Sequence, residues 1–205
     1  MNFDELNKQY RLRHNKALTK MAKKIEAHLH DLLNQQPRVD RIVARAKSPE
    51  RFIGKAQKTL DKGQLKYSDP LNQIQDQIGA RIVTFYNSDI DPLSKKIKDY
   101  LSPIEEQVFI PDSVNEFGYE GIHYILFIPT ELFDKDIPKE LCPTFFELQI
   151  KTLFEHSWAE ANHDLAYKPE NPLTPEQKRK IAFTAAQAWG ADNIFDDLFQ
   201  ELHKN

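Results

Sequence analysis

The sequence predicts an α/β fold of the α+β kind, with a mixed sheet of about five strands flanked by helices and long helices at both ends. Three observations favour this fold class. Short stretches with strand character recur between residues 38 and 151. Helical patterns alternate with them, as expected when helices pack on a sheet. The 205 residues have ordinary apolar content and suffice for one sizeable core, so we expect one compact domain.

Residues 1–36 are predicted to form an N-terminal helix. From Phe3 to Leu33 the apolar residues recur every three or four positions, which indicates an amphipathic helix. The recurring residues are Leu6, Tyr10, Ala17, Met21, Ile25, Leu29 and Leu32. The pattern stops at Pro37, and we interpret this helix as scaffold.

Residues 37–170 are predicted to hold the main domain. Residues 38–47 indicate a first strand rich in Val and Ile. Ser48 is expected to cap a helix that has Pro49 at its first position. Residues 60–71 contain Gly63 and Pro70 and indicate an exposed loop, followed by a short helical turn up to Asp76. Residues 78–86 form the clearest strand of the chain.

The second part of this domain continues the alternation. A helix is expected from Ile90 to Leu101, before Pro103. Strands at 104–110 and 122–128 follow, joined by a polar loop. In the next strand, which begins at 145, apolar residues alternate with Glu147, Gln149 and Lys151, so one face of it is polar. Thr152 can cap a helix that runs on through the apolar positions up to residue 166.

Residues 171–205 are predicted to form a C-terminal helical segment, after a break at 169–172. Thr174, Pro175 and Gln177 make a capping-box start. We expect an interruption near Gly190. The rest of the helix has a broad apolar face formed by Phe195, Leu198, Phe199 and Leu202. This face could dock on the core or pair with another subunit in a homo-oligomer, and the sequence leaves both open.

Charge is unevenly divided along the chain. Residues 1–66 hold 16 Lys and Arg against 7 Asp and Glu, a balance of +9, and residues 67–205 hold 12 against 24, a balance of −12. The division favours phosphate-rich ligands on the basic part and metal ions on the acidic part, although two solvated helix faces would also explain it. The sequence has no apolar run long enough for a membrane span, and its N-terminus lacks the apolar centre of a signal peptide. Cys142 is the single cysteine, which excludes a disulfide framework and fits a reducing cytoplasm.

Basic residues near the first predicted strand are candidates for phosphate binding. Alternation places Arg41, Arg45 and Lys47 on one strand face, and Arg51 and Lys55 lie one helical turn apart. Together they could clamp a triphosphate, with arginine also able to stack on a base. The alternative is a solvated basic surface.

The clearest strand also carries polar candidates. Asp76 stands just before it and is a reasonable Mg²⁺ ligand, since Mg²⁺ nucleotide sites use one or two carboxylates together with phosphate oxygens. Asp76 could equally be a helix or turn cap. Arg81 lies within the apolar strand, where an arginine needs a partner or a ligand.

A glycine-containing loop is a candidate for a second nucleotide. Gly118 and Gly121 permit close approach of the backbone, and Tyr119 and His123 could present a ring and a hydrogen-bonding edge to a base. A tight turn with a packed aromatic ring is the alternative.

The polar face of the strand from 145 carries the candidate for chemistry. If Glu147 faces Asp76 across the sheet, the pair could hold Mg²⁺, and Glu147 could assist deprotonation of a hydroxyl nucleophile. The alternative is an exposed strand face with an ion pair. His163 and Asp164 form an HD dipeptide of the kind found in metal-dependent hydrolases. No other upstream His or downstream Asp is arranged to complete such a site, so we reject that interpretation.

Five motifs in this order and spacing resemble a known family. R-x-K, DQIGAR, GYEGIH, ELQIKT and HDLAYK, from about Arg41 to Lys168, resemble the synthetase domain of the RelA/SpoT-homologue family of alarmone pyrophosphokinases. The chain resembles a single-domain small alarmone synthetase, because it has no room for the separate hydrolase and regulatory domains. The resemblance implies a nucleotidyltransferase-like fold and transfer of the β,γ-pyrophosphate of ATP to the 3′-hydroxyl of GDP or GTP, making (p)ppGpp.

The resemblance also implies residue roles. Arg45 and Arg81 would sandwich the adenine of ATP, and the phosphates would lie near Arg41, Lys47, Arg51 and Lys55. Asp76 and Glu147 would bind Mg²⁺, with Glu147 also activating the acceptor hydroxyl. Tyr119 would stack on the acceptor base, near His123, Gln149, Lys151 and His156. Positioning and charge neutralisation dominate reactions of this class.

Some positions depart from the family pattern. Asn115, Glu116 and Glu120 stand where basic residues usually meet the acceptor phosphates, and Lys151 replaces an arginine. An acidic loop would repel a 5′-diphosphate. A second hypothesis is therefore the toxic branch of the family, which pyrophosphorylates the 3′-CCA end of tRNA. The basic N-terminal helix would then contact RNA, and an antitoxin or regulatory partner becomes an open question. A third hypothesis, an inactive nucleotide-binding regulator, is disfavoured because both Asp76 and Glu147 are present.

Overall fold

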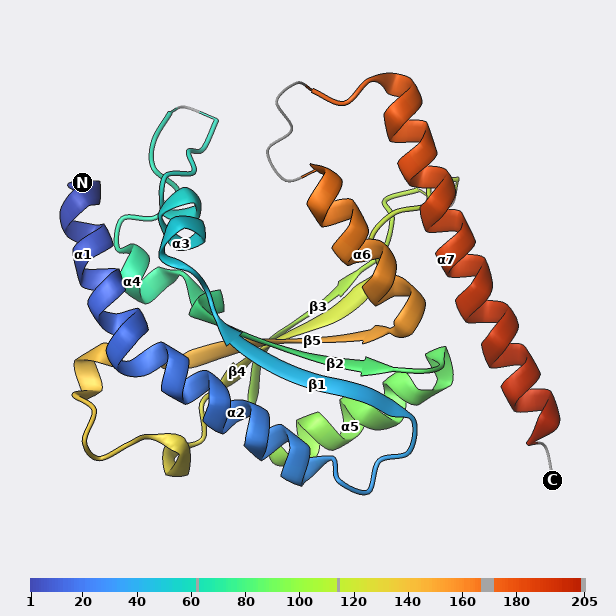
Figure 1. Ribbon diagram of the computed structural model, residues 1–205, viewed down its shortest axis with the longest axis horizontal. Coiled ribbons are helices and arrows are strands. Elements are labelled where there is room, and N and C mark those ends of the chain that lie inside the picture. The colour runs from blue at the N-terminus through green and yellow to red at the C-terminus, as the bar shows by residue number, and fades with distance from the viewer. Residues whose placement is uncertain (62, 114, 167–171, 204–205) are drawn as a thin grey trace.

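The computed structural model describes residues 1–61, 63–113, 115–166 and 172–203 and contains a five-stranded mixed sheet (Figure 1). The strands are β1 (Val39–Ala46), β2 (Ile78–Thr84), β3 (Pro103–Phe109), β4 (Gly121–Phe127) and β5 (Phe145–Thr152). Their order across the sheet is β1-β2-β5-β4-β3. The β2–β5 pair is parallel and the other pairs are antiparallel. The predicted fold class is confirmed.

Helices lie on both sides of this sheet (Figure 1). The α-helices are α1 (Phe3–Arg13), α2 (Thr19–Leu32), α3 (Pro49–Ala56), α4 (Pro70–Gln73), α5 (Ile90–Tyr100), α6 (Leu153–Ala166) and α7 (Pro175–Leu202). Shorter elements are the π-helical turn η1 (His14–Leu18) and the 3₁₀ turns η2 (Gln75–Gln77), η3 (Asn87–Asp89), η4 (Thr130–Leu132) and η5 (Lys139–Leu141). The predicted strands and helices are therefore present, with ends that differ by a few residues.

One face of the sheet is apolar and carries the core. Residues paired across neighbouring strands share a face, so Ile42, Ile82 and Ile150 lie together, and all are buried. Helix α2 packs against β1 and β2, and α5 packs against β5. Each fully buried Leu or Ile side chain in this layer contributes about 1.5–3 kcal/mol through removal of apolar surface from water.

The opposite face is polar. Arg45 pairs with Gly79 and Gly79 with Glu147, while Arg81 pairs with Gln149, which in turn pairs with His123. The period of two in each strand thus aligns the polar residues of β1, β2, β5 and β4 on one surface. Lys47 follows the last residue of β1 instead of lying within the strand.

The N-terminal helix is continuous in direction but contains the π-helical turn η1 between α1 and α2. Two of its side chains contact the segments that border the polar face of the sheet. The Tyr10 hydroxyl donates to the Lys47 carbonyl at 2.8 Å, and its ring stacks on Phe52 of α3. Arg13 donates to the carbonyls of Leu71 and Glu140 and to Gln77, the residue after Asp76. These contacts agree with the interpretation of this helix as scaffold.

The residues predicted to cap the starts of helices do so. The Ser48 hydroxyl accepts from the Arg51 amide, and the Thr152 hydroxyl accepts from the Glu155 amide. Thr174 and Gln177 form a reciprocal capping box at the start of α7. Tyr167, Lys168 and residues 169–171 of the predicted break lie outside the described residues.

The predicted interruption near Gly190 is wrong, because α7 is one helix of 28 residues. A glycine costs a helix only about 1 kcal/mol. Packing of α7 along α6, with Phe195 stacked on Phe154, compensates for a cost of this size (Figure 1).

The apolar face of α7 docks on the core in part. Phe199 stacks on Tyr86 with ring centroids 4.5 Å apart, whereas Ile194, Leu198 and Leu202 stay exposed. Core docking is thus observed, and subunit pairing stays a prediction. No helix in the described part of the chain is long and apolar enough to cross a membrane.

Candidate active site

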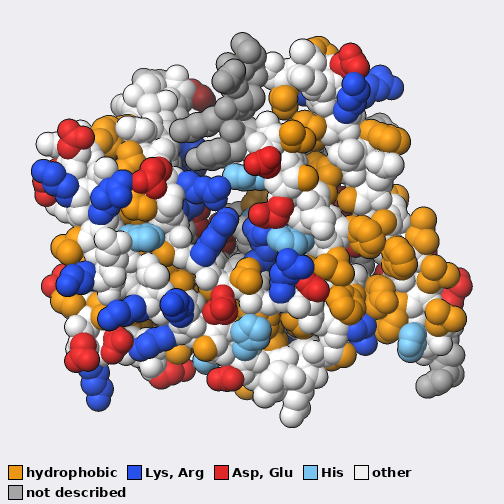
Figure 2. Space-filling view, in the orientation of Figure 1, with side chains coloured by type: hydrophobic (Ala, Val, Ile, Leu, Met, Phe, Trp, Pro, Cys, Tyr) orange, Lys and Arg blue, Asp and Glu red, His pale blue; other side chains and the backbone are white. Residues whose placement is uncertain are grey.

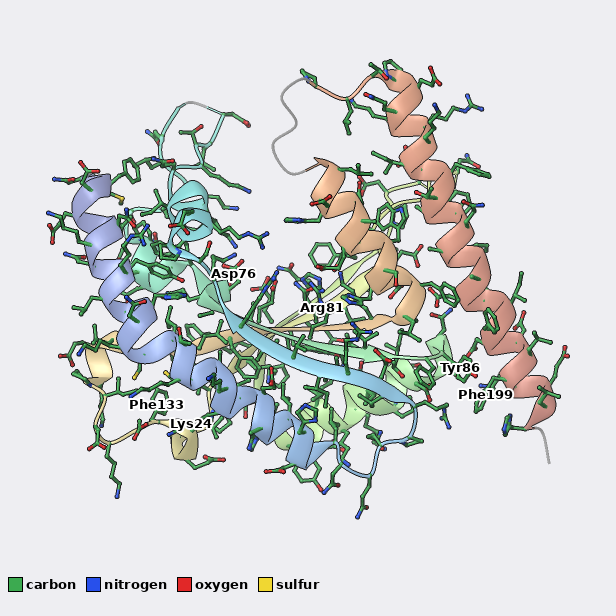
Figure 3. The ribbon with its side chains drawn as sticks, viewed as in Figure 1. Lys24, Asp76, Arg81, Tyr86, Phe133 and Phe199 are labelled. Carbon is green, nitrogen blue, oxygen red and sulfur yellow. The ribbon has the colours of Figure 1, made fainter. Side chains whose placement is uncertain are left out.

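The candidate site lies on the polar face of the sheet, between α3 and α6. Figure 3 shows Asp76 and Arg81 on this side of the sheet, coming from the turn before β2 and from β2 itself. In Figure 2, Lys and Arg side chains gather at the middle of the same view, with His side chains beside them.

Asp76 is held by two lysines from separate elements. Its Oδ2 atom lies 3.0 Å from Lys47 Nζ, just after β1, and 2.9 Å from Lys55 Nζ on α3. Its Oδ1 atom is buried and has no hydrogen-bond partner among the described residues. Burial raises the pKa of Asp76, but the charges of Lys47 and Lys55 more than reverse this effect, so the pKa is lower than usual. The carboxylate is therefore ionised at neutral pH and has one oxygen available.

Glu147 is held by a second set of partners. His123 Nδ1 lies 3.2 Å from Glu147 Oε1, and Gln149 Nε2 donates to Oε2 at 2.9 Å. Burial raises the pKa of Glu147, and the interaction with His123 more than offsets it, so the pKa is lowered. His123 Nε2 in turn lies 2.6 Å from the Tyr119 hydroxyl. Tyr119, His123 and Glu147 thus form one hydrogen-bonded chain.

The two carboxylates are close enough to interact. Glu147 pairs with Gly79, three residues after Asp76, and the charge of Asp76 raises the pKa of Glu147. Two carboxylates, one of them with a buried unpartnered oxygen, fit Mg²⁺, which takes hard oxygen ligands and completes its shell with substrate phosphates and water. No group of three or more His, Cys, Asp or Glu suited to a metal occurs in the described residues.

Arg81 finds partners on α6 and β5. Its Nη1 atom lies 3.0 Å from His156 Nδ1 and 2.6 Å from Glu160 Oε1, and Nη2 contacts Gln149. Its Nε atom is buried without a partner among the described residues. The expectation that a strand arginine needs partners is met mainly by Glu160, which sequence reasoning missed because 79 positions separate the two residues. Burial and the charge of Arg81 lower the pKa of His156.

Lys151 and Tyr119 pack against each other on the same face. Lys151 Nζ lies 4.2 Å from the centre of the Tyr119 ring, in a cation–π contact. Burial and the nearby Arg81 lower the pKa of Lys151 to about 8. Burial raises the pKa of Tyr119, so its phenol stays neutral at physiological pH. Both side chains are oriented by neighbours within the sheet.

The other predicted cations lie at the border of the site. Arg41 pairs with Asp40, and Arg41 also contributes to lowering the pKa of His156. Arg45 contributes to lowering the pKa of Glu160. Arg51 lies on the first turn of α3, four residues before Lys55. The structure therefore brings Lys47, Lys55 and Arg81 to the two carboxylates and leaves Arg41, Arg45 and Arg51 around them.

Comparison with known proteins identifies relatives. Residues 44–172 match the sequence family described as the region found in RelA / SpoT proteins. None of the curated proteins matches the chain. The solved structure of small alarmone synthetase 1 from Bacillus subtilis has a TM-score of 0.75 at 17% identity, covering 97% of this chain and 98% of that one.

Two further solved structures are similar. The same Bacillus subtilis protein bound to its product pppGpp has a TM-score of 0.71 at 18% identity, covering 89% of this chain and 93% of that one. A GTP pyrophosphokinase family protein from Streptococcus pneumoniae has a TM-score of 0.70 at 20% identity, covering 89% of each chain. At these identities the likeness shows a shared fold, extending through the long terminal helices in the first case.

Proposed function

This chain belongs to the family that carries the RelA/SpoT region, and from that premise we propose that it is an ATP:nucleotide 3′-pyrophosphokinase. It transfers the β,γ-pyrophosphate of ATP to the 3′-hydroxyl of GDP or GTP and makes (p)ppGpp. The structurally similar proteins include a small alarmone synthetase bound to pppGpp and a GTP pyrophosphokinase family protein, which supports the proposal.

The observation that carries the proposal is the arrangement around the two carboxylates. Asp76 and Glu147 interact on one face of the sheet, with Lys47 and Lys55 directly on Asp76. Transfer of a charged phosphoryl group depends on positioning the reactants and on neutralising phosphate charge. The two carboxylates can position a metal ion, and the two lysines can neutralise phosphate charge.

On the donor side, the lysines and Arg81 bind ATP. Lys47 and Lys55 contact the phosphates, because they are the cations that already converge on the metal-ligand candidate Asp76. Arg81, together with Arg45, holds the adenine between guanidinium planes. Arg81 has an unpartnered Nε atom and an exposed ion-pair partner, so exchanging Glu160 for a ligand costs little.

On the acceptor side, Glu147 receives the proton. The acceptor 3′-oxygen forms a bond to the β-phosphorus of ATP, the bond from that phosphorus to the α,β-bridging oxygen breaks, and AMP leaves with this oxygen. The proton of the 3′-hydroxyl passes to Glu147, whose position is fixed by His123 and Gln149. Asp76 and Glu147 would hold Mg²⁺, which when bound neutralises phosphate charge.

One observation favours a second acceptor. Glu116 is exposed and Glu120 is partly buried in the loop that leads to β4, and neither is paired with a cation in any described ion pair. Such a loop is unfavourable for a 5′-diphosphate and repels the 3′ end of tRNA less, because the terminal nucleotide there carries a single phosphodiester charge at its 5′ side; the remaining phosphates of tRNA could contact the basic N-terminal helix. The tRNA 3′-CCA end is therefore the alternative acceptor.

A labelling experiment tests the proposal. Purified protein is incubated with Mg²⁺, ATP labelled at the γ-phosphate, and one of GDP, GTP or deacylated tRNA, and the products are separated. We expect transfer of label to GDP or GTP. Label on tRNA alone supports the alternative, and no transfer to any acceptor contradicts the proposal.

The matched variants are Glu147→Gln and Glu131→Gln. E147Q keeps the shape of the side chain but removes its charge and its ability to take a proton, so transfer should fall by at least about 10²-fold while ATP binding persists. Glu131 is exposed on η4, which packs near α2, so E131Q should behave as wild type. Unchanged transfer by E147Q would exclude Glu147 from the chemistry.

A further inference from the structure

Helix α1 lies directly behind the turn that carries Asp76. In Figure 1 it runs beside α3 and α4, and Arg13 at its end reaches the carbonyl of Leu71 in α4. The charge of Asp76 contributes, after burial, to the raised pKa of Tyr10, so these two groups are close. Helix α1 precedes residues 44–172 that match the family, yet it borders the candidate metal site.

Tyr10 of this helix fixes the backbone of Lys47. Its hydroxyl donates to the Lys47 carbonyl at 2.8 Å, and the Lys47 amide donates to the Gln77 carbonyl at 2.8 Å. Tyr10 is fully buried and its ring is stacked on that of Phe52 with centroids 3.7 Å apart, so the hydroxyl has little freedom. Both backbone polar groups of Lys47 are therefore held, at the point from which its ammonium group reaches Asp76.

Gln77 fixes the other partner of this ion pair. Its buried side chain donates from Nε2 to the carbonyls of Leu71 and Ile74, and its Oε1 atom accepts from Arg13. Asp76, the residue before it, has φ −88° and ψ 34°, outside the helical range of its 3₁₀ turn. The hydrogen bonds of Gln77 therefore set the direction in which the Asp76 carboxylate points.

The polar atoms of Tyr10 and Gln77 are more than packing requires. A phenylalanine would fill the place of Tyr10 and keep the stack on Phe52, and an apolar side chain could fill the place of Gln77. A buried hydroxyl and a buried amide carry a desolvation cost that their hydrogen bonds offset only in part or by a small margin. Because the bonds that they donate end on Lys47, Leu71 and Ile74, these polar atoms specify the geometry around Asp76.

We propose that Tyr10 and Gln77 are positioning residues that fix the spacing between Lys47 and Asp76, and thereby set the preference of the site for Mg²⁺-bound ATP over metal-free ATP. The inference rests on the proposed function and deepens it. Lys47 would meet the phosphates and Asp76 the ion. Mg²⁺ accepts little distortion of its octahedral shell, so a carboxylate displaced relative to the phosphates holds the ion less well.

The test compares Tyr10→Phe with wild type. Calorimetry gives the Kd for ATP with Mg²⁺ present and again with Mg²⁺ removed by a chelator, and the ratio of the two values is the Mg²⁺ preference. The affinity of Mg²⁺ for free ATP is the same in every sample, so a change of the ratio reports the protein. Y10F loses one hydrogen bond and keeps the ring, and we expect its preference to fall about three- to tenfold.

Tyr100→Phe is the matched control. Tyr100 is 70% exposed on α5, on the other face of the sheet, so Y100F should keep the wild-type preference. Gln77→Met, which removes every hydrogen bond of that side chain, should lower the preference at least about tenfold. Circular dichroism shows whether each variant is folded. Loss of stability alone would lower the number of ATP molecules bound per protein and leave the Mg²⁺ preference unchanged.

The outcomes separate this inference from the proposed function. An unchanged Mg²⁺ preference in folded Y10F overturns the inference, as does an equal fall in Y100F. A wild-type protein that binds ATP equally well with and without Mg²⁺ also overturns it. If wild type transfers pyrophosphate in these cases, the pyrophosphokinase stands. If the preference falls in Y10F alone but wild type transfers label to no acceptor, the positioning role stands and the pyrophosphokinase fails.

Discussion

Asp192 should make the stability of the protein depend on pH. Its pKa rises from 3.8 to about 7 in the folded state because of burial first, and because of Glu155 and Glu120. The folded state therefore keeps a proton that the unfolded state loses above about pH 4. The contribution of Asp192 to the free energy of unfolding is fully present below about pH 4. It is lost progressively as the pH rises to about 7, by up to about 4 kcal/mol.

The variant D192N should remove this cost. Its free energy of unfolding should exceed that of wild type by about 1–4 kcal/mol at pH 8, with a smaller difference at pH 5. Urea unfolding followed by circular dichroism at pH 5, 6.5 and 8 measures both proteins. Asp197→Asn, on the exposed side of the same helix, should track wild type at every pH. A D192N difference that does not grow with pH would show that Asp192 is not the titrating group.

Single residues show what the sequence could predict of the site. Residue type and position singled out Asp76, Glu147 and Arg81, because a carboxylate beside a strand and an arginine within one are unusual. Their partners could not be predicted in the same way. The ion pair of Lys55 with Asp76 and that of Glu160 with Arg81 join separate elements, and only folding brings them together.

At the scale of elements, the loop before β4 depends on Gly121. Its φ is +153°, and a Cβ there would lie 3.2 Å from the Tyr119 hydroxyl oxygen. We predict that Gly121→Ala displaces Tyr119 from His123 and raises the KM for the acceptor roughly tenfold, with a smaller effect on the KM for ATP. Acceptor affinity should fall because the hydrogen bond between Tyr119 and His123, the first link in the series that ends at Glu147, would be broken.

Gly118 offers the matched control. An added Cβ at Gly118 meets no atom within 4 Å, so Gly118→Ala should keep both KM values. Steady-state transfer assays on the two variants give the comparison. Equal acceptor KM values for G121A and wild type would mean that the position of Tyr119 does not matter for the acceptor.

The sequence predicted where several helices begin, but it did not predict irregularities within helices or their absence. Ser48, Thr152 and Thr174 each cap the helix that their sequence signature predicts. The π-helical turn at His14–Leu18 and the unbroken course of α7 through Gly190 have no such signature. Asp192 follows Ala185 by seven positions and shares its buried face, but the burial of that face is seen only in the structure.

At the scale of the whole molecule, Arg13 ties the N-terminal helix to the rest of the chain. It is 7% exposed and donates to Leu71, Gln77 and Glu140, which lie in three different segments. We predict that Arg13→Met lowers the free energy of unfolding by about 2–4 kcal/mol, because the buried Gln77 side chain and two part-buried carbonyl oxygens lose their donor. The melting temperature should fall by roughly 5–15 °C.

Lys16→Met is the control for this variant. Lys16 is exposed on the same helix, and the change in side chain is comparable, so its melting temperature should stay within a few degrees of wild type. Thermal denaturation followed by circular dichroism measures both. Equal melting temperatures for R13M and K16M would contradict an anchoring role for Arg13.

The division of the sheet into two faces was predictable from alternation, since Glu147, Gln149 and Lys151 share one side of their strand. Helix α7 was harder to place. Its amphipathic pattern predicted burial of one face, and Phe195 and Phe199 are packed in part, but the pattern did not specify that α7 would close a cavity beside Glu155. Packing between helices distant in sequence is decided by the shapes of both surfaces.

The ion pairs on Asp76 have a consequence for the order in which ligands assemble. Without nucleotide, two ammonium groups already neutralise this carboxylate, so a divalent ion alone must compete with them. In the proposed enzyme, arriving phosphates draw Lys47 and Lys55 away and release Asp76 for the ion. Nucleotide and ion therefore strengthen each other's binding by the same factor, as thermodynamic reciprocity requires. The proposed enzyme would therefore bind ATP and the divalent ion together, and would bind the free ion only weakly.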